Sequence, residues 1–293
     1  MQNQLLEHYL EQLKKRCLVD GGFVHRAGGG YRPDATAWAI LALKAARISI
    51  DELELSMLRL TTDQLEDGRI SISSEHPEAF WPTPLAVLAW QGSPAYRKPQ
   101  SRAVRSLLNK TGVHWLKRSD SAQAHDTSIR GWPWIENTHS WVEPTALSLI
   151  ALQITGYGGH DRAIEGRRML LDRQLSQGGW NYGNTITFGK ELRPMPDSTG
   201  VALNALAGSV SRQDIKHSLQ YLKSRVKNIR SPRALGWSIL GLGAWGERPS
   251  EAPSWILESL RLQEKYGNYD TSPLSLMLIS FMAPGGIAGA LAK

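Results

Sequence analysis

The feature that most constrains the fold of this chain is a nearly apolar segment of eight residues that recurs six times. Each copy has small residues on part of its surface, and four of the six begin with threonine. The copies occupy residues 36–43, 83–90, 145–152, 199–206, 235–242 and 272–279. Self-similarity at a spacing of tens of residues indicates a stack of supersecondary units. We therefore expect six apolar helices packed around one axis.

Amphipathic segments lie between these copies, and their apolar residues recur at helical spacing. They occupy residues 5–16, 51–64, 101–116, 162–174, 212–225 and 253–263. A helix that is apolar on all sides is buried, whereas an amphipathic helix buries one face. The alternation predicts an all-α (α/α)6 toroid, with six inner helices inside six outer helices. No linker or composition shift divides the chain, so we expect one domain over residues 1–293.

Composition narrows the class of protein. The chain is 41% hydrophobic and 21% charged, which argues against disorder. Its net charge of +7 is spread along the sequence and forms no basic stripe, so we expect no nucleic-acid partner. No apolar run reaches membrane-spanning length, and the N-terminus lacks a signal-peptide core. We expect a cytoplasmic protein, with peripheral contact to the inner membrane face as an open option.

A turn motif recurs before several of the apolar segments. Its fullest form contains Gln174, Gly178 and Trp180, and variants occupy residues 17–23, 64–70 and 263–269. The glycine permits the left-handed residue that ends a helix. The glutamine amide can satisfy backbone groups freed at the helix end, and the aromatic ring can cover them.

This turn, followed by a helix with the pattern Asp/Pro-Thr-Ala-x-Ala-Leu, resembles the prenyltransferase and squalene-cyclase repeat family. The family comprises class II terpene cyclases and protein prenyltransferase β subunits, and the resemblance covers nearly the whole chain. It implies a toroid with a central apolar cavity that binds a hydrophobic small molecule of isoprenoid type.

The residues that lie two positions before each apolar segment form a column in the aligned repeats. Because they come at the starts of the inner helices, we expect them at one mouth of the barrel. Four of its six members are carboxylates. The members are Asp34, Trp81, Glu143, Asp197, Arg233 and Asp270. One interpretation is helix capping, since aspartate is a preferred N-cap and suits the helix dipole. The other is an acidic site, because neighbouring like charges in an apolar environment raise a carboxyl pKa.

The family resemblance implies specific roles at this mouth. Class II cyclases carry Asp-x-Asp-Asp-Thr-Ala at such a helix entrance, with the middle aspartate as the general acid. Asp197 occupies that position here, while Met195 and Ser198 replace the flanking aspartates. Such cyclases also normally pair two toroids. The resemblance implies Asp197 as the acid, and the carboxylate column predicts Glu143 and Asp34 as its catalytic neighbours.

Protein prenyltransferases hold zinc with an aspartate, a cysteine and a histidine. The only cysteine here is Cys17, in the first turn, and no Asp-x-Cys pair exists. Because a thiolate is hard to replace in such a site, we expect no zinc and no zinc-dependent prenylation. No motif indicates another metal or a cofactor.

Aromatic and polar residues near the entrances are the candidates for substrate binding. Aromatic faces stabilise cations, as a carbocation cyclase requires. Histidine titrates near neutrality, so His139 could pass protons to Glu143 or simply hydrogen-bond within its loop. The candidates are Trp38, Trp81, Trp141, Trp237, His139, Glu78, Asp270 and Arg233.

Three functions remain open from the sequence. The leading hypothesis is a terpene-cyclase-like protein that binds an isoprenoid-type lipid and cyclises or isomerises it by acid catalysis. A non-catalytic binding or scaffold toroid is the first alternative. A glycan-active (α/α)6 enzyme with paired carboxylates is the second. A deep apolar cavity would favour the first hypothesis, and an open groove with tryptophans would favour the last.

Overall fold

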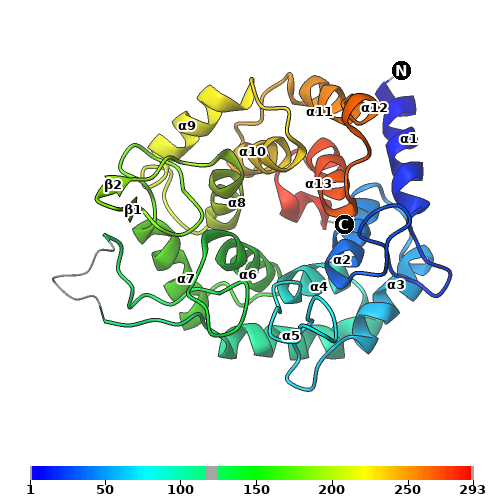
Figure 1. Cartoon of the computed structure of the whole chain (residues 1–293), viewed down its shortest axis with the longest axis horizontal. Coiled ribbons are helices and arrows are strands. Elements are labelled where there is room, and N and C mark those ends of the chain that lie inside the picture. Colours follow the sequence, from blue (N-terminus) through cyan, green and yellow to red (C-terminus); the bar gives the residue numbers. More distant parts are fainter. Residues whose placement is uncertain (1, 117–123, 292–293) are drawn as a thin grey trace.

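The computed structural model describes residues 2–116 and 124–291. Figure 1 shows two concentric rings of helices, which confirms the all-α (α/α)6 toroid. The inner ring consists of α2 (Pro33–Ala45), α4 (Thr83–Trp90), α6 (Val142–Ile154), α8 (Pro196–Leu206), α10 (Pro232–Ala244) and α13 (Thr271–Met282). The outer ring consists of α1 (Gln2–Lys14), α3 (Ile50–Thr62), α5 (Arg97–Asn109), α7 (Asp161–Asp172), α9 (Lys216–Val226) and α11 (Ala252–Arg261), which α12 (Gln263–Tyr266) follows.

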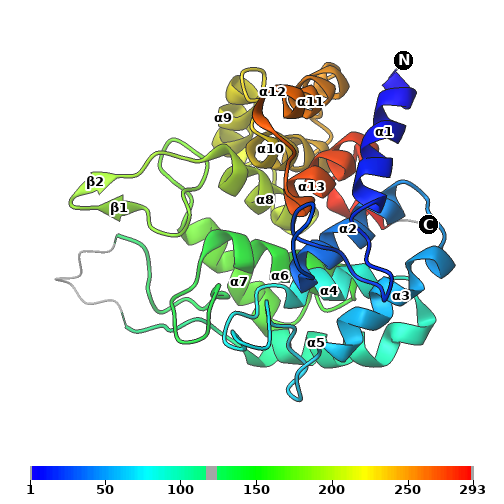
Figure 2. The same ribbon diagram turned by 45° about the vertical axis from the view of Figure 1, so that its right-hand side comes forward.

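Strand structure in the described residues is limited to short pieces. The strands β1 (Ile186–Thr187) and β2 (Lys190–Glu191) form an antiparallel hairpin in the long loop between α7 and α8. This hairpin projects from the rings in both Figure 1 and Figure 2. Two 3-10 turns, η1 (Pro94–Tyr96) and η2 (Ile287–Ala290), complete the set of elements.

The repeated threonine ties each inner helix to the turn that precedes it. In four repeats its hydroxyl accepts a hydrogen bond from the backbone N–H of the residue in the aromatic position of the turn. The pairs are Phe23 with Thr36 at 2.8 Å, Ile70 with Thr83 at 3.0 Å, Trp132 with Thr145 at 2.9 Å, and Trp180 with Thr199 at 3.0 Å. Each bond satisfies a buried N–H group, which would otherwise be costly to bury. The threonine column therefore fixes where four of the six inner helices begin.

The turn motif has the predicted backbone conformation. Gly178 has a φ of +92°, and a side chain there would collide with the backbone of His217 on α9. Gln64 donates from its amide to the carbonyl oxygens of Gly68 at 3.0 Å and Pro99 at 2.8 Å. Trp180 is fully buried and donates from its indole to Leu170. The turns thus dock each outer helix against the next repeat.

One predicted outer helix ends earlier than expected. The apolar spacing predicted a helix over 101–116, but α5 ends at Asn109 and Lys110 adopts an extended conformation. The chain then pairs Val113 with His139 in a parallel bridge, so tertiary pairing replaces the last turns of the helix.

The C-terminal segment lies across the end of the barrel where the inner helices finish. Ile287 is fully buried in η2, which packs against α2 and α13. Gly286 sits against Asn204 of α8 and Ala244 of α10, where a side chain would have no space. The opposite end, where the inner helices start, carries the long loops and the polar residues considered next.

Candidate functional site

Three side chains from consecutive inner helices meet at the starts of those helices. Glu143 lies in the first turn of α6, Asp197 in the first turn of α8 and Arg233 in the first turn of α10. The Arg233 guanidinium donates from Nη2 to Glu143 Oε2, and its Nε lies 3.4 Å from Asp197 Oδ2. The two carboxylate side chains are 13% and 14% exposed, whereas Arg233 is 51% exposed. We call these three residues the mouth cluster.

Glu143 has the most perturbed carboxyl group in the mouth cluster. Burial is the largest influence and raises the pKa of Glu143 to about 7. The nearby Arg233 charge and its hydrogen bond act in the opposite direction, while the Asp197 charge raises the pKa further. A carboxyl group with a pKa near the working pH can both donate and accept a proton, as general acid–base catalysis requires.

Tyr182 and Trp141 border the mouth cluster. The Tyr182 carbonyl accepts a 2.8 Å hydrogen bond from the N–H of Val142, at the start of α6. Burial raises the pKa of the Tyr182 phenol, and the Asp197 and Glu143 charges add to that effect. Trp141 packs against Gly183, where a Cβ atom would lie 2.9 Å from the indole. The site therefore combines two carboxylates and a guanidinium, with the Tyr182 phenol within reach of their charges.

The other two carboxylates of the column lie elsewhere on the ring. Asp34 on α2 is 2% exposed and binds Arg32, with Oδ1 at 2.8 Å from Nε and Oδ2 at 3.1 Å from Nη2. Asp270, which precedes α13, lies 3.2 Å from His25 Nε2. Because α4 separates α2 from α6 in the ring, Asp34 does not join the mouth cluster. Its predicted role beside Asp197 therefore lacks a direct contact.

The capping interpretation of the column fits the position of Asp270 but not the positions of the other three carboxylates. Asp34, Glu143 and Asp197 follow the N-cap by two residues, whereas Asp270 itself holds the N-cap position. No side-chain cap hydrogen bond is present at the start of any of these four helices. Proline occupies the first helical position before Asp34 and Asp197, as its fixed φ favours. Asp34, Glu143 and Asp197 instead pair with arginines, while the helix dipole still favours their charge.

Trp38 of α2 and Trp237 of α10 meet inside the inner ring. Their ring centroids are 5.8 Å apart with an interplanar angle of 73°, an edge-to-face contact. The two residues are 6% and 1% exposed. Since α13 lies between α2 and α10, the two indoles fill space inside the ring rather than line an open cavity there. For either tryptophan to contact a substrate, as predicted, the two indole rings would have to move apart.

The remaining predicted binding residues lie in the loops around the mouth. His139 stacks 4.6 Å from Trp141 and lies 6.5 Å from Trp115, by ring centroids. Burial lowers the pKa of His139, and the nearby Arg173 charge lowers it further, so the imidazole is neutral at neutral pH. Its Nε2 is buried, without a hydrogen-bond partner among the described residues. Proton transfer from His139 to Glu143 has no contact to support it.

The loop before α4 holds Trp81 and Glu78 apart from the mouth cluster. Trp81 packs edge-to-face against Trp134 at 5.5 Å. Glu78 is 45% exposed and pairs with His76, 3.4 Å from its Nδ1. Trp81 therefore holds two loops together, and Glu78 contributes to the outer rim.

The structure also bears on metals and membranes, within residues 2–116 and 124–291. In that part of the chain, no three histidine, cysteine, aspartate or glutamate side chains come together as metal ligands. None of its helices is both long enough and apolar enough to cross a bilayer.

Tyr182 is the residue of the site that sequence reasoning missed. It lies in an irregular loop after the turn motif and belongs to no repeated column. Only its position two residues after Trp180, the aromatic residue of the turn, offered a signal.

Solved structures with the same fold include two different classes of enzyme. One is the type II terpene cyclase MstE from Scytonema in complex with geranylgeranyl dihydroxybenzoate, at 14% identity and a TM-score of 0.63, covering 99% of this chain and 97% of that one. Another is an inactive variant of the α-1,6-mannanase GH76A of Salegentibacter sp. HEL1_6 in complex with α-1,6-mannotriose. It shows 10% identity and a TM-score of 0.67, covering 96% and 99% of the two chains.

At these identities the likeness establishes the fold and nothing finer. No family model matches the chain, and no curated protein matches it. This chain covers 97% of the cyclase chain in that comparison, so the two chains span a similar extent of the fold.

Proposed function

We propose that this protein binds a hydrophobic small molecule of isoprenoid type at the barrel mouth and transforms it by proton transfer through Glu143. The carrying observation is a largely buried Glu143 whose pKa is about 7 and which shares Arg233 with Asp197. Such a group is protonated in a large fraction of molecules at neutral pH. It can therefore supply a proton to an oxygen or a double bond held against it.

The acid in this proposal is Glu143 rather than Asp197. Burial and the Asp197 charge both favour the protonated form of Glu143. Asp197 then acts as a neighbouring charge that helps to set the pKa of the acid. This arrangement exchanges the roles that the Asp-x-Asp-Asp resemblance implied.

The kinds of side chain at the mouth support the isoprenoid hypothesis. The structures of the cyclase MstE include variants in which an aspartate, an arginine or a tyrosine was replaced. Here a carboxyl pair, Arg233 and Tyr182 meet at one entrance. In our proposal Arg233 and Tyr182 hold the oxygen-bearing head group of the ligand, and the Trp141 indole holds its apolar part.

A glycan-active enzyme is the second candidate, and two observations favour it. Trp38 and Trp237 contact each other across the ring and occupy interior space that a long polyprene would need. A carboxylic acid with a raised pKa beside a second carboxylate is also the usual equipment for cleaving a glycosidic bond. The two candidates share Glu143 as the acid and differ in the ligand.

Turnover assays with matched variants test the proposal. We would incubate the purified chain with prenyl diphosphates, prenylated phenols and α-1,6-manno-oligosaccharides, and detect products by mass spectrometry. We expect conversion of a prenylated compound, with activity falling as the pH rises above about 7 and Glu143 loses its proton. The variant Glu143→Gln should lose about 100- to 10,000-fold in kcat, because an amide cannot deliver a proton.

The control is Asp34→Asn, which makes the same chemical change at a carboxylate outside the mouth cluster and should retain wild-type kcat. Both variants should keep the helical circular-dichroism signal. Conversion of the oligosaccharides alone would select the glycan candidate. Ligand binding without turnover by the wild type would select a binding or scaffold role, and wild-type activity in Glu143→Gln would remove Glu143 from the mechanism.

A further inference from the structure

A second polar surface runs along the outer helix α9, away from the barrel axis. Residues 211–227 contain five lysines and arginines and one aspartate, a net charge of +4, so the positive charge is more concentrated here than we expected from the sequence. The basic residues are Arg212, Lys216, Lys223, Arg225 and Lys227. Two grooves flank this helix, and Gln220 borders both of them.

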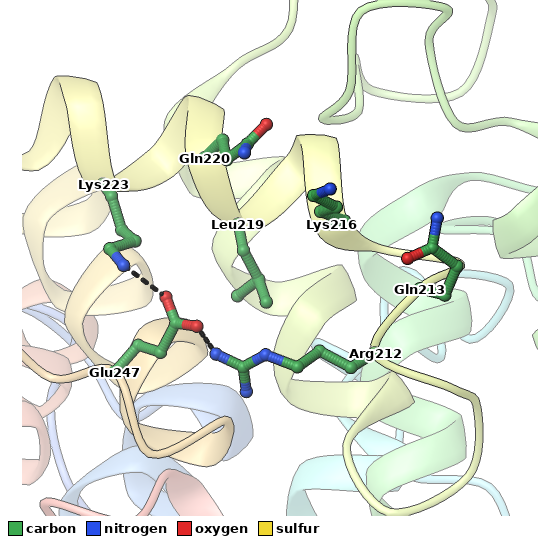
Figure 3. Close-up of a pocket in the computed structure, with 7 residues that line it drawn as sticks. All are labelled: Arg212, Gln213, Lys216, Leu219, Gln220, Lys223 and Glu247. Carbon is green, nitrogen blue, oxygen red and sulfur yellow. Dashed lines mark ion pairs between the residues drawn. The ribbon is translucent and has the colours of Figure 1, made fainter.

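The two grooves differ in how their cations are paired. On one flank, Glu247 binds Arg212 and lies 2.9 Å from Lys223, as Figure 3 shows. This carboxylate, which is 13% exposed, neutralises much of the charge in a groove of about 330 Å³. Lys216 borders the same groove, and Figure 3 shows no ion pair on it.

The groove on the other flank of α9 has about 880 Å³ and no carboxylate in its lining. Its basic residues are Arg193, Arg225 and His217, and Ser176, Ser224 and Tyr221 add hydroxyl groups. Neither arginine forms a salt bridge with a described residue. Glu191, the acidic residue next to this rim, is held by Ser176 through both the backbone N–H and the hydroxyl at 2.8 Å. Two exposed guanidinium groups therefore face an open groove without a counter-charge.

Hydrogen bonds between separate segments hold the walls of this groove in place. The Tyr221 hydroxyl donates a 2.7 Å hydrogen bond to the Pro194 carbonyl, which joins α9 to the segment that leads into α8. On the other side, Gly179 donates from its N–H to the hydroxyl of Ser218 at 2.6 Å and fixes the repeat turn against α9. Pro194 and Tyr221 lie on the walls of the groove. Arg193 and Arg225 lie on its rim, next to or on these hydrogen-bonded segments, so their backbone is held in place.

We infer that the groove between α9 and the segment 193–194 binds a phosphate- or diphosphate-bearing ligand. Guanidinium groups match phosphate oxygens in geometry and hold them through paired, charge-assisted hydrogen bonds. Serine hydroxyls and an imidazole add donors for the same oxygens. The volume exceeds that of a single oxyanion, so the ligand also places part of its organic portion in the groove.

The groove also has a defined relation to the barrel mouth. The Tyr221 hydroxyl binds the carbonyl of Pro194, which lies three residues before Asp197 of the mouth cluster. A molecule whose phosphate end lies between Arg193 and Arg225 can extend toward that mouth. Binding of the anion itself does not depend on catalysis by Glu143.

Calorimetric titration with inorganic diphosphate tests the inference, with sulfate as the reference anion. We expect saturable binding of diphosphate that is stronger than that of sulfate. Arg193→Gln and Arg225→Gln should each weaken it about tenfold, the scale of one charge-assisted hydrogen bond. The matched control is Lys216→Gln, which removes the same charge from the other flank of α9 and should change the affinity less than about threefold through long-range electrostatics alone.

A second measurement separates a free phosphorylated molecule from a lipid head group. Phosphatidylcholine vesicles with and without phosphatidic acid are sedimented with the protein. Arginine-dependent binding to diphosphate alone identifies a free ligand, and additional arginine-dependent sedimentation with phosphatidic acid identifies a lipid phosphate. Equal losses in the Lys216 and arginine variants would show non-specific attraction to a basic surface and overturn the inference. Absence of binding in both measurements would also overturn it, whatever the result at Glu143.

Discussion

Two parts of the inner ring begin their helices with the same kind of residue and use it differently. At α2, Asp34 is closed off by Arg32, which lies only two residues earlier in the chain. At α6, α8 and α10, Glu143 and Asp197 share one arginine that belongs to a third helix. The first arrangement is local and complete, whereas the second depends on three segments that meet only in the folded barrel.

The difference shows how a structural ion pair is distinguished from a site prepared for chemistry. Asp34 has both oxygens bound by one guanidinium, so its charge is fully compensated where it is buried. Glu143 is buried, receives part of one guanidinium and has a second carboxylate nearby. Burial first, and the Asp197 charge after it, raise its pKa to about 7 despite Arg233. Incomplete compensation leaves a group that can exchange a proton at neutral pH.

The strongest test of this comparison removes each arginine in turn. Arg233 lowers the pKa of Glu143 through its charge and its hydrogen bond, so Arg233→Leu should raise that pKa above 7. It should also reduce kcat about 100-fold or more, because the carboxylate formed by proton donation loses its stabilising cation. The pH–rate profile would show the alkaline limb moving to higher pH.

Arg32→Leu is the matched control, since Arg32 has Asp34 as its ion-pair partner and no contact with the mouth cluster. It should leave both kcat and the position of the alkaline limb unchanged. If the two arginine variants shifted the profile equally, the distinction between the local pair and the mouth cluster would be lost.

The second test concerns stability. Here the change at α2 should have the larger effect and the change in the mouth cluster the smaller one, the reverse of the order expected for activity. Asp34 is 2% exposed and its pair with Arg32 is bidentate, so Asp34→Asn should lower the free energy of unfolding by about 2 kcal/mol. Arg233 is 51% exposed, and Glu143, with a pKa of about 7, can take up a proton when the cation is lost. Arg233→Leu should therefore change stability by less than about 1 kcal/mol. Urea denaturation at pH 7 measures both, and a larger loss for Arg233→Leu would contradict the assignment of structural and chemical roles.

Much of the fold could be predicted from the sequence because the constraints repeat. The same local geometry is encoded several times along the chain. It is encoded by six apolar segments, by a threonine at the same position in four of them, and by a glycine turn. The hydrogen bonds from Phe23 to Thr36 and from Trp180 to Thr199 show that residues at the same position in different repeats make the same contact. The error at 101–116 arose where a non-repeated contact, Val113 with His139, competed with helical propensity.

The site could be predicted only as a set of candidates. When the six repeats of the chain are aligned, one column identifies Glu143, Asp197 and Arg233 as residues at helix entrances. It does not show which cation reaches which carboxylate. That pairing depends on the order of helices in the ring and on the length of the Arg233 side chain. Tyr182 lies in an irregular loop, and the contact of Trp38 with Trp237 crosses the ring. None of these features leaves a periodic signal.

The mildest change in the mouth cluster gives the finest test of the comparison. The Asp197 charge raises the pKa of Glu143, so removing that charge with Asp197→Asn should lower the pKa below about 7. Because the acid is then deprotonated at lower pH, the alkaline limb of kcat/KM should move toward lower pH, opposite to the shift for Arg233→Leu. The rate at the new optimum should stay within about threefold of wild type, since the amide keeps the volume of the side chain and Glu143 still carries the proton. A complete loss of turnover in Asp197→Asn would instead make Asp197 the acid, and an unchanged profile would show that its charge does not reach Glu143.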